Sequence, residues 1–218
     1  MIGAMSSSHH TRRAALTGLG ATLVAAPALA GPARTAARAE VEGHPGFSAW
    51  QAVAPRKGNL PLKGEVVLSS GERTPLKAWL DGRPTVLIVW ASWCGPCMAD
   101  KPFQARMDRK LKAAGSRTRI ASVQCFDEDA DPEAVGWRLK RLGAQDLANA
   151  VATPRLQKDI LRWFGPASSD RTRTFTPSLA LIGGDGTTLG RCDGRPFTPD
   201  DREWWPRSAA FELLTSLR

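Results

Sequence analysis

Apolar residues along this chain form short runs. Stretches rich in polar residues, glycine and proline separate these runs. The most pronounced run is 85–90 (TVLIVW), which is largely apolar and β-branched and is typical of a strand buried on both faces. Shorter runs predict further strands, and apolar residues at helical spacing predict helices. The expected strands are 65–68, 85–90, 119–126, 178–182 and 187–192, and the expected helices are about 97–114, 131–142, 154–164 and 208–217.

Turn residues and prolines are placed consistently with these elements. Gly71 lies in a turn signal after the first strand, and 183–186 (GGDG) predicts the turn of a hairpin. Pro132 suits the first turn of a helix, whereas Pro102 lies inside an expected helix and should kink it. Because strands and helices alternate, the sequence predicts an α/β fold with a mixed central β-sheet flanked by helices on both faces.

The N-terminus has the pattern of an export signal. Arg12 and Arg13 precede an uncharged stretch that ends at 28–30 (ALA), a small-x-small cleavage pattern. The paired arginines are similar to the twin-arginine signal of bacteria. An uncleaved membrane anchor and a disordered alanine-rich tail are the alternatives, and a second small-residue site at 37–39 leaves the position of cleavage open.

Three regions follow from this pattern. We expect a twin-arginine-type signal peptide or anchor at 1–30, and a linker with one short ordered piece near 47–50 over residues 31–60. The folded domain is expected at 61–218. Both the signal and the anchor interpretation place this domain outside the cytoplasm, in the periplasm or an equivalent compartment, where disulfides can form.

Composition narrows the range of functions. Lysine and arginine outnumber aspartate and glutamate by 30 to 21, which gives a net charge of +9. The basic residues are scattered, so they predict a basic, solvated surface and no nucleic-acid partner. The four cysteines are too few for a scaffold built on disulfides. Two of them have only two residues between them, however, and this spacing calls for a chemical explanation.

The motif Trp93-Cys94-Gly95-Pro96-Cys97 lies between a buried strand and a helix. A thiolate is the species that attacks a disulfide, and the N-terminus of a helix stabilises a thiolate, so Cys94 is the expected exposed attacking residue. Cys97 lies nearly one helical turn further on and can resolve a mixed disulfide. Gly95 permits a tight entry to the helix, and Pro96 fits its first turn.

A zinc site and plain core cysteines are the alternatives for this motif. A zinc site needs about four ligands. The chain has no second Cys-x-x-Cys, and His44 is the only histidine after the first thirty residues. Core cysteines would rarely carry Gly-Pro between them. We therefore expect no metal, and no cofactor other than a redox-active disulfide between Cys94 and Cys97.

WCGPC after TVLIVWAS resembles the thioredoxin superfamily, and it is most similar to the exported TlpA/ResA-like branch. That branch carries an acid and a proline after the motif, where this chain has Asp100 and Pro102. The stretch 70–84 resembles the N-terminal β-hairpin of the branch and its turn into the active-site strand, and 174–191 resembles its Thr-Pro segment and the following strand pair. The resemblance covers about 62–196 and implies a thioredoxin-like fold.

The resemblance also implies roles for single residues. The Thr176–Pro177 bond is expected to be cis and to pack against the cysteine pair, with the backbone before the proline binding the substrate chain; a plain proline at a strand start is the alternative. Ile88 stands where cytoplasmic thioredoxins have a buried Asp, so Asp100 is a candidate proton relay. The alternative for Asp100 is compensation of the helix dipole. Trp93 is expected to support substrate binding.

Three further features carry expectations. The residues near 144–173 lengthen the usual link between strands and are interpreted as an insertion over one edge of the sheet. Cys125 and Cys192 are expected to remain unbonded, because the strands that carry them are separated by two others in the implied sheet. Trp204 and Trp205 are expected to pack the C-terminal helix, with a docking patch as the alternative.

The residues and the resemblance together imply a thiol–disulfide oxidoreductase. A reductase of oxidised exported proteins, with apocytochrome c as one candidate, fits the Gly-Pro between the cysteines; its electrons would come from a membrane dithiol donor. An oxidase or isomerase that uses the same pair is the alternative. A copper-handling module would need Cys-x₃-Cys and a distant His, and a peroxidase would need a threonine at Ala91. A monomer is expected.

Overall fold

The computed structural model describes most of the chain after residue 37. The described residues are 38–48, 50–53, 58–125, 127, 130–165, 177–193 and 209–217. The expected signal peptide at 1–30, Thr176 and the pair Trp204 and Trp205 therefore lie outside the described residues. Within the described part, no helix is both long and apolar enough to cross a membrane.

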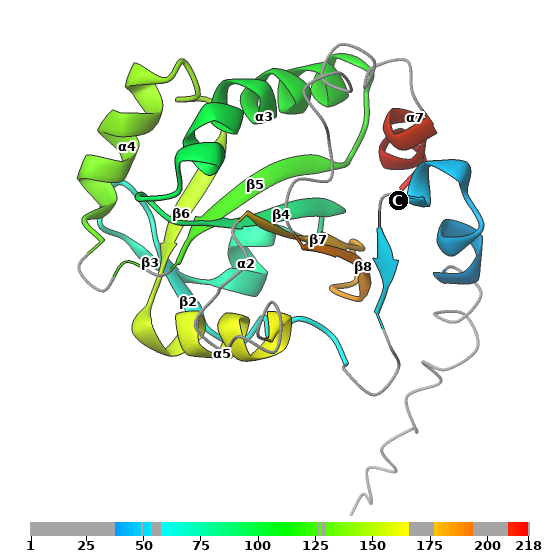
Figure 1. Ribbon diagram of the computed structural model, residues 1–218, viewed down its shortest axis with the longest axis horizontal. Helices are drawn as coiled ribbons and strands as arrows, with labels where there is room; N and C mark the ends of the chain where they lie inside the picture. The colour runs from blue at the N-terminus through cyan, green and yellow to red at the C-terminus, as the bar shows by residue number, and fades with distance from the viewer. Residues whose placement is uncertain are drawn as a thin grey trace, which may run out of the picture.

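An eight-stranded sheet in the order β1-β8-β7-β4-β5-β6-β2-β3 forms the centre of the described structure (Figure 1). Strand β4 pairs parallel with β5 and antiparallel with β7, and β5 pairs parallel with β6. The strands are β1 Gln51–Ala52, β2 Glu65–Val67, β3 Arg73–Pro75, β4 Thr85–Trp90, β5 Arg119–Gln124, β6 Ala148–Ala152, β7 Ser178–Ile182 and β8 Thr188–Asp193. The helices are the 3-10 helix η1 Pro45–Phe47 and the α-helices α2 Leu76–Leu80, α3 Gly95–Ala113, α4 Pro132–Arg141, α5 Pro154–Phe164 and α7 Ala209–Ser216.

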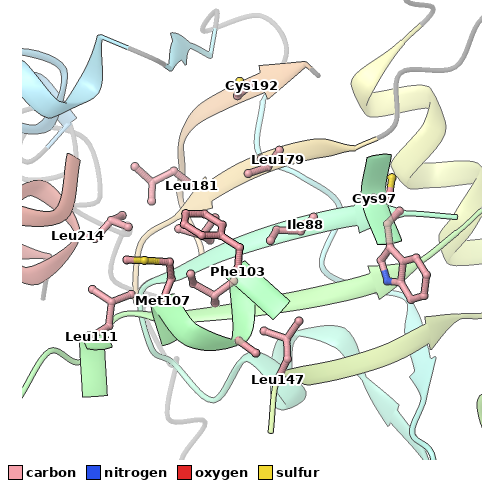
Figure 2. Close-up of a cluster of buried hydrophobic side chains, with 14 of the residues drawn as sticks. Ile88, Cys97, Phe103, Met107, Leu111, Leu147, Leu179, Leu181, Cys192 and Leu214 are labelled. Atoms are coloured by element: carbon pink, nitrogen blue, oxygen red, sulfur yellow. The ribbon is translucent and has the colours of Figure 1, made fainter. Parts of the chain in front are cut away.

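Helices cover both faces of the sheet, as expected. Alternate residues of β4 enter two separate apolar clusters: Ile88 belongs to the cluster with α3, α4 and α7, and Leu87 to the cluster with α2 and α5. Figure 1 shows α3 and α4 on one side of the sheet and α5 on the other. In Figure 2, Phe103 and Met107 of α3 point onto the strands beside Ile88. The α/β class with a thioredoxin-like sheet is confirmed, since β8-β7-β4-β5 with β7 antiparallel is the core order of that fold.

Strand β6 corrects the interpretation of 144–173 as an insertion over the edge of the sheet. Ala148–Ala152 lies inside the sheet, parallel to β5 and antiparallel to β2, with Val66 opposite Ala152. Helix α5 follows it and packs Leu156 and Ile160 into the core. The strand reads ANAVA, and its small and polar residues lack the β-branched signal that marks β4. The extra residues therefore widen the sheet by one βα unit.

The segment expected as a linker at 31–60 also differs from the prediction. Residues 38–42 are helical, η1 follows, and β1 pairs with β8 at one edge of the sheet. Phe47 and Trp50 are each only 6% exposed and pack over Gly190, where a Cβ would lie 2.8 Å from the Phe47 ring. The sequence predicted one short ordered piece near 47–50 but not strand β1. A two-residue strand is too short to produce a periodic pattern in the sequence. The described core therefore extends upstream of residue 61.

Cys125 and Cys192 do not form a disulfide, as predicted from the strand order. Strands β7 and β4 lie between their strands in the sheet. The two side chains also belong to different apolar clusters, Cys125 to the one with α5 and Cys192 to the one with α3. They therefore lie on opposite faces of the sheet and cannot bond.

Candidate functional site

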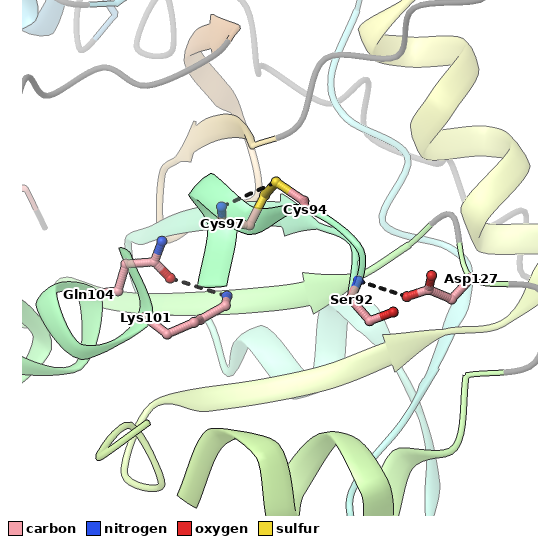
Figure 3. The surroundings of a disulfide bond; sticks show 6 residues. All are labelled: Ser92, Cys94, Cys97, Lys101, Gln104 and Asp127. Atoms are coloured by element: carbon pink, nitrogen blue, oxygen red, sulfur yellow. Dashed lines mark hydrogen bonds between the residues drawn. A yellow bond between two sulfur atoms is a disulfide. The ribbon is translucent and has the colours of Figure 1, made fainter. Parts of the chain in front are cut away.

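The Cys94–Cys97 disulfide lies where β4 ends and α3 begins (Figure 3). Cys94 is the N-cap of α3 with φ −79° and ψ 94°, and its Sγ accepts a hydrogen bond from the Cys97 N–H at 3.2 Å. Pro96 is in the first turn, where a missing N–H leaves no hydrogen bond unmade. The two Cα atoms are 5.2 Å apart, which suits a disulfide. When this bond is reduced, the same N–H and the helix dipole favour a thiolate at Cys94.

The exposure of the motif differs from the expectation at Cys94. Its side chain was expected to be exposed, but Cys94 is 5% exposed and Cys97 is 1% exposed. The N-cap position turns Cys94 inward against the end of β4, where both sulfurs join the apolar cluster that contains Trp90. Trp93 is 62% exposed and, like Gly95 and Pro96, faces solvent beside the disulfide. Among the described residues, these three are the exposed members of the motif.

Hydrogen bonds to Asp127 hold the loop before the disulfide. Asp127 Oδ2 accepts the Ser92 N–H at 2.9 Å and also accepts a hydrogen bond from Gln124 Nε2 (Figure 3). The Cys125 N–H donates to the Trp90 carbonyl at 2.8 Å, which joins the ends of β4 and β5. The sequence analysis did not identify Asp127. The signal in the sequence was an acid just after β5. Because β5 pairs parallel with β4, the ends of the two strands lie at the same end of the sheet.

Pro177 lies at the same sheet edge as the disulfide loop. It is buried and directly precedes β7, whose first residue, Ser178, pairs with Val89 near the end of β4. The next register position therefore places Pro177 opposite Trp90. Thr176 lies outside the described residues, so the expected backbone contact with a substrate chain stays a prediction.

Asp100 and Lys101 follow Cys97 on the first turns of α3. Asp100 is half-buried and acts electrostatically on Lys101, and its expected proton relay stays a prediction. Lys101 is completely buried, and the sequence analysis did not single it out. Its Nζ donates to Gln104 Oε1 at 3.2 Å and lies 4.2 Å from the centre of the Trp90 ring. Burial lowers the pKa of Lys101 well below its ordinary value, and Asp100 partly opposes this shift.

The other described candidates for chemistry are inert or absent. Burial raises the pKa of the Cys125 thiol, and the charge of Asp127 raises it further, so Cys125 stays protonated. Among the described residues, no group of three or more His, Cys, Asp or Glu side chains could hold a metal ion. Cys94 and Cys97 are the two described cysteines that form a disulfide.

Comparison with known proteins gives distant similarities. No protein-family model matches the chain. A chicken (Gallus gallus) protein disulfide-isomerase is 28% identical over 104 residues, which cover 45% of this chain and 20% of that protein. The chain thus matches only about a fifth of the length of this relative.

Two of the similar solved structures are of thiol–disulfide proteins. A thiol:disulfide interchange protein DsbE from Chlorobium tepidum is 26% identical, with a TM-score of 0.48 over 72% of this chain and 95% of that chain. A secreted Mycobacterium tuberculosis disulfide oxidoreductase, homologous to E. coli DsbE, is 18% identical, with a TM-score of 0.46 over 68% and 94% of the two chains.

The molecule's own geometry defines its class. A buried strand leads into a helix whose N-cap is the first cysteine of a Cys-Gly-Pro-Cys motif, and the two cysteines of this motif form a disulfide. The sheet order around this site is that of a thioredoxin-like fold. The described part of the chain therefore has a thioredoxin-like fold with a disulfide at the start of the helix that follows its central strand.

Proposed function

We propose that this protein reduces disulfides of exported proteins through the Cys94–Cys97 pair. The observation that carries the proposal is the placement of Cys94 at the N-terminus of α3, with its sulfur accepting the Cys97 N–H. This environment stabilises a thiolate, which makes Cys94 both a good nucleophile and a good leaving group. No cofactor beyond the cysteine pair enters the proposal.

The reaction runs in two exchange steps. The Cys94 thiolate attacks one sulfur of the partner's disulfide, so a Cys94–partner bond forms and the other partner sulfur leaves as a thiolate. Cys97 then loses its proton and attacks Cys94 Sγ, which forms the Cys94–Cys97 disulfide and releases the second partner sulfur. Two electrons pass to the partner, and the protein is left with its own disulfide. A dithiol donor must then reduce this bond again.

The exposed surface beside the disulfide fits a protein partner. Trp93 offers a large apolar side chain, and Gly95 and Pro96 leave the entrance to the helix open on the solvent side. An aromatic anchor of this kind can bind an extended partner segment without a deep pocket. We propose that oxidised proteins outside the cytoplasm, apocytochrome c among them, bind here, and that a membrane dithiol donor supplies the electrons. The paired arginines Arg12 and Arg13 and the apolar stretch after them support export.

The reduction potential separates a reductase from an oxidase or isomerase that uses the same pair. We expect the full-length protein, equilibrated in thiol redox buffers, to have a potential nearer to about −270 mV, the thioredoxin value, than to about −120 mV, the value of the periplasmic oxidase DsbA. Cys94→Ser is the blank, because it cannot form the pair. A potential near about −120 mV would contradict electron delivery and make the protein a disulfide donor.

A further inference from the structure

Lys101 is a buried cation whose position the two exchange steps do not explain. Its side chain is 0% exposed, whereas Lys110 and Lys112 of the same helix are exposed. An ammonium group buried without compensation is costly, so a lysine in such a place either loses its proton or has partners for its charge.

The surroundings of Lys101 suit both its neutral amine and its ammonium form. Burial lowers the pKa of its amine, which eases the loss of a proton. The Gln104 carbonyl oxygen and the face of the Trp90 ring are in place to stabilise the ammonium form. Among the described residues, no carboxylate forms an ion pair with Lys101, and Asp100 is the charged group whose field acts on it. Its charge can therefore change without breaking a salt bridge in this part of the structure.

The helix places this group next to the resolving cysteine. Lys101 follows Cys97 by four positions, so the two side chains are neighbours on one face of α3. Side chains on a helix lean toward its N-terminus, which directs Lys101 toward Cys97. In Figure 3, the end of the Lys101 side chain lies under the first turns of α3. Its Nζ lies 4.2 Å from the centre of the Trp90 ring, and Trp90 shares a buried cluster with both cysteines.

Cys97 needs such a neighbour because solvent scarcely reaches it. Its side chain is 1% exposed, and Ile88, six positions before Cys94, offers no acid or base on this face of the sheet. We propose that the Lys101 amine takes up the proton of the Cys97 thiol during the resolving step. This inference rests on the proposed function, since it concerns the second of the two exchange steps.

The step balances in charge and in bonds. With Cys94 bonded to the partner sulfur, the Cys97 proton passes to the Lys101 amine, which gives a thiolate and an ammonium in place of two neutral groups. The thiolate attacks Cys94 Sγ, the Cys94–Cys97 bond forms, and the bond from Cys94 to the partner breaks with its electron pair on the partner sulfur. The Lys101 proton then neutralises the departing thiolate or passes to solvent.

Stopped-flow mixing of the reduced full-length protein with one equivalent of the aromatic disulfide 5,5′-dithiobis(2-nitrobenzoate) separates the two steps. Attack by Cys94 releases the first coloured thiolate, and resolution by Cys97 releases the second. We expect Lys101→Met to keep the first phase and to slow the second by about 10²-fold at neutral pH, the lower range for loss of a general base. The pH midpoint of the second phase should rise, because Cys97 must then ionise without the amine.

Two more variants sharpen the test. Lys110→Met makes the same change on an exposed lysine of α3 and should leave both phases as they are. Gln104→Leu removes the acceptor for the ammonium and should slow the second phase alone, by about tenfold. If Lys101→Met fails to fold, the rate of the second phase in Gln104→Leu tests the role of Lys101 instead.

A second phase of wild-type rate and pH profile in Lys101→Met, or in Gln104→Leu when the first variant does not fold, would overturn the role of Lys101. A wild-type protein without any phase that Cys94→Ser abolishes would overturn the proposed function itself, and this inference with it.

Discussion

Replacing Cys94 by serine is expected to abolish disulfide reduction. A serine hydroxyl at the N-cap can still accept the N–H of residue 97, so the start of α3 is preserved. It cannot form a thiolate or a mixed disulfide, however, and Cys97 is too buried at 1% exposure to replace it as the attacking group. The measurement is the rate of insulin reduction with dithiothreitol as the donor, which should fall to the rate of dithiothreitol alone.

Cys125→Ser is the matched control for this loss. It removes a cysteine whose thiol is free and buried on the sheet face that packs against α5. Because burial raises the pKa of that thiol, its exchange reactivity is negligible, and the variant should keep the wild-type rate within about twofold. Retained activity in Cys94→Ser, or an equal loss in the two variants, would remove Cys94 from the mechanism.

Replacing Gly46 by alanine is expected to lower stability strongly, although this residue lies outside the redox site. A Cβ on Gly46 would lie 2.0 Å from the carbonyl oxygen of Ala209 and 2.8 Å from the Ala210 nitrogen. Both atoms belong to the backbone of α7, which cannot move without uncovering Leu213 and Leu214 in the core. We expect a loss of about 2–3 kcal/mol in the free energy of unfolding, the upper range for overpacking.

Thermal unfolding followed by circular dichroism measures this loss. For a chain of this size it corresponds to a fall in Tm of about 4–12 °C. Gly43→Ala is the matched control, because the nearest atom to its new Cβ is 3.4 Å away, at the edge of ordinary contact. It should change the free energy of unfolding by less than about 0.5 kcal/mol. Equal stabilities for the two variants would show that η1 and α7 do not pack as described.

Elements with a strong local signal could be predicted from the sequence. The run TVLIVW forms β4 over the expected residues, and the helix expected at 154–164 forms there, because proline at a first turn and apolar residues at helical spacing act locally. Elements that depend on partners were missed. The alanines of β6 become a strand only because β5 and β2 pair with both of its edges, and β1 only because β8 offers a free edge.

The site shows the same division. The spacing of Cys94 and Cys97 and the helix that begins between them follow from the motif itself. The low exposure of Cys94 does not, because it results from how the N-cap meets the end of β4. Strand register places Asp127 at the site, and helix packing places Lys101 there. The sequence does not reveal this, because a charged residue near a motif is usually exposed to solvent. Only the folded arrangement distinguishes these two from the exposed charges along the chain.

Trapping the mixed disulfide tests the central claim most directly. Cys97→Ser leaves Cys94 as the attacking thiol and removes the group that resolves the intermediate. Incubated with an excess of oxidised glutathione and analysed by mass spectrometry under denaturing, non-reducing conditions, this variant should carry one glutathione, bonded to Cys94. Wild-type protein should form its own Cys94–Cys97 disulfide instead, and Cys94→Ser should carry none. Glutathione on another cysteine of Cys97→Ser, or none at all, would contradict an exchange reaction that begins at Cys94.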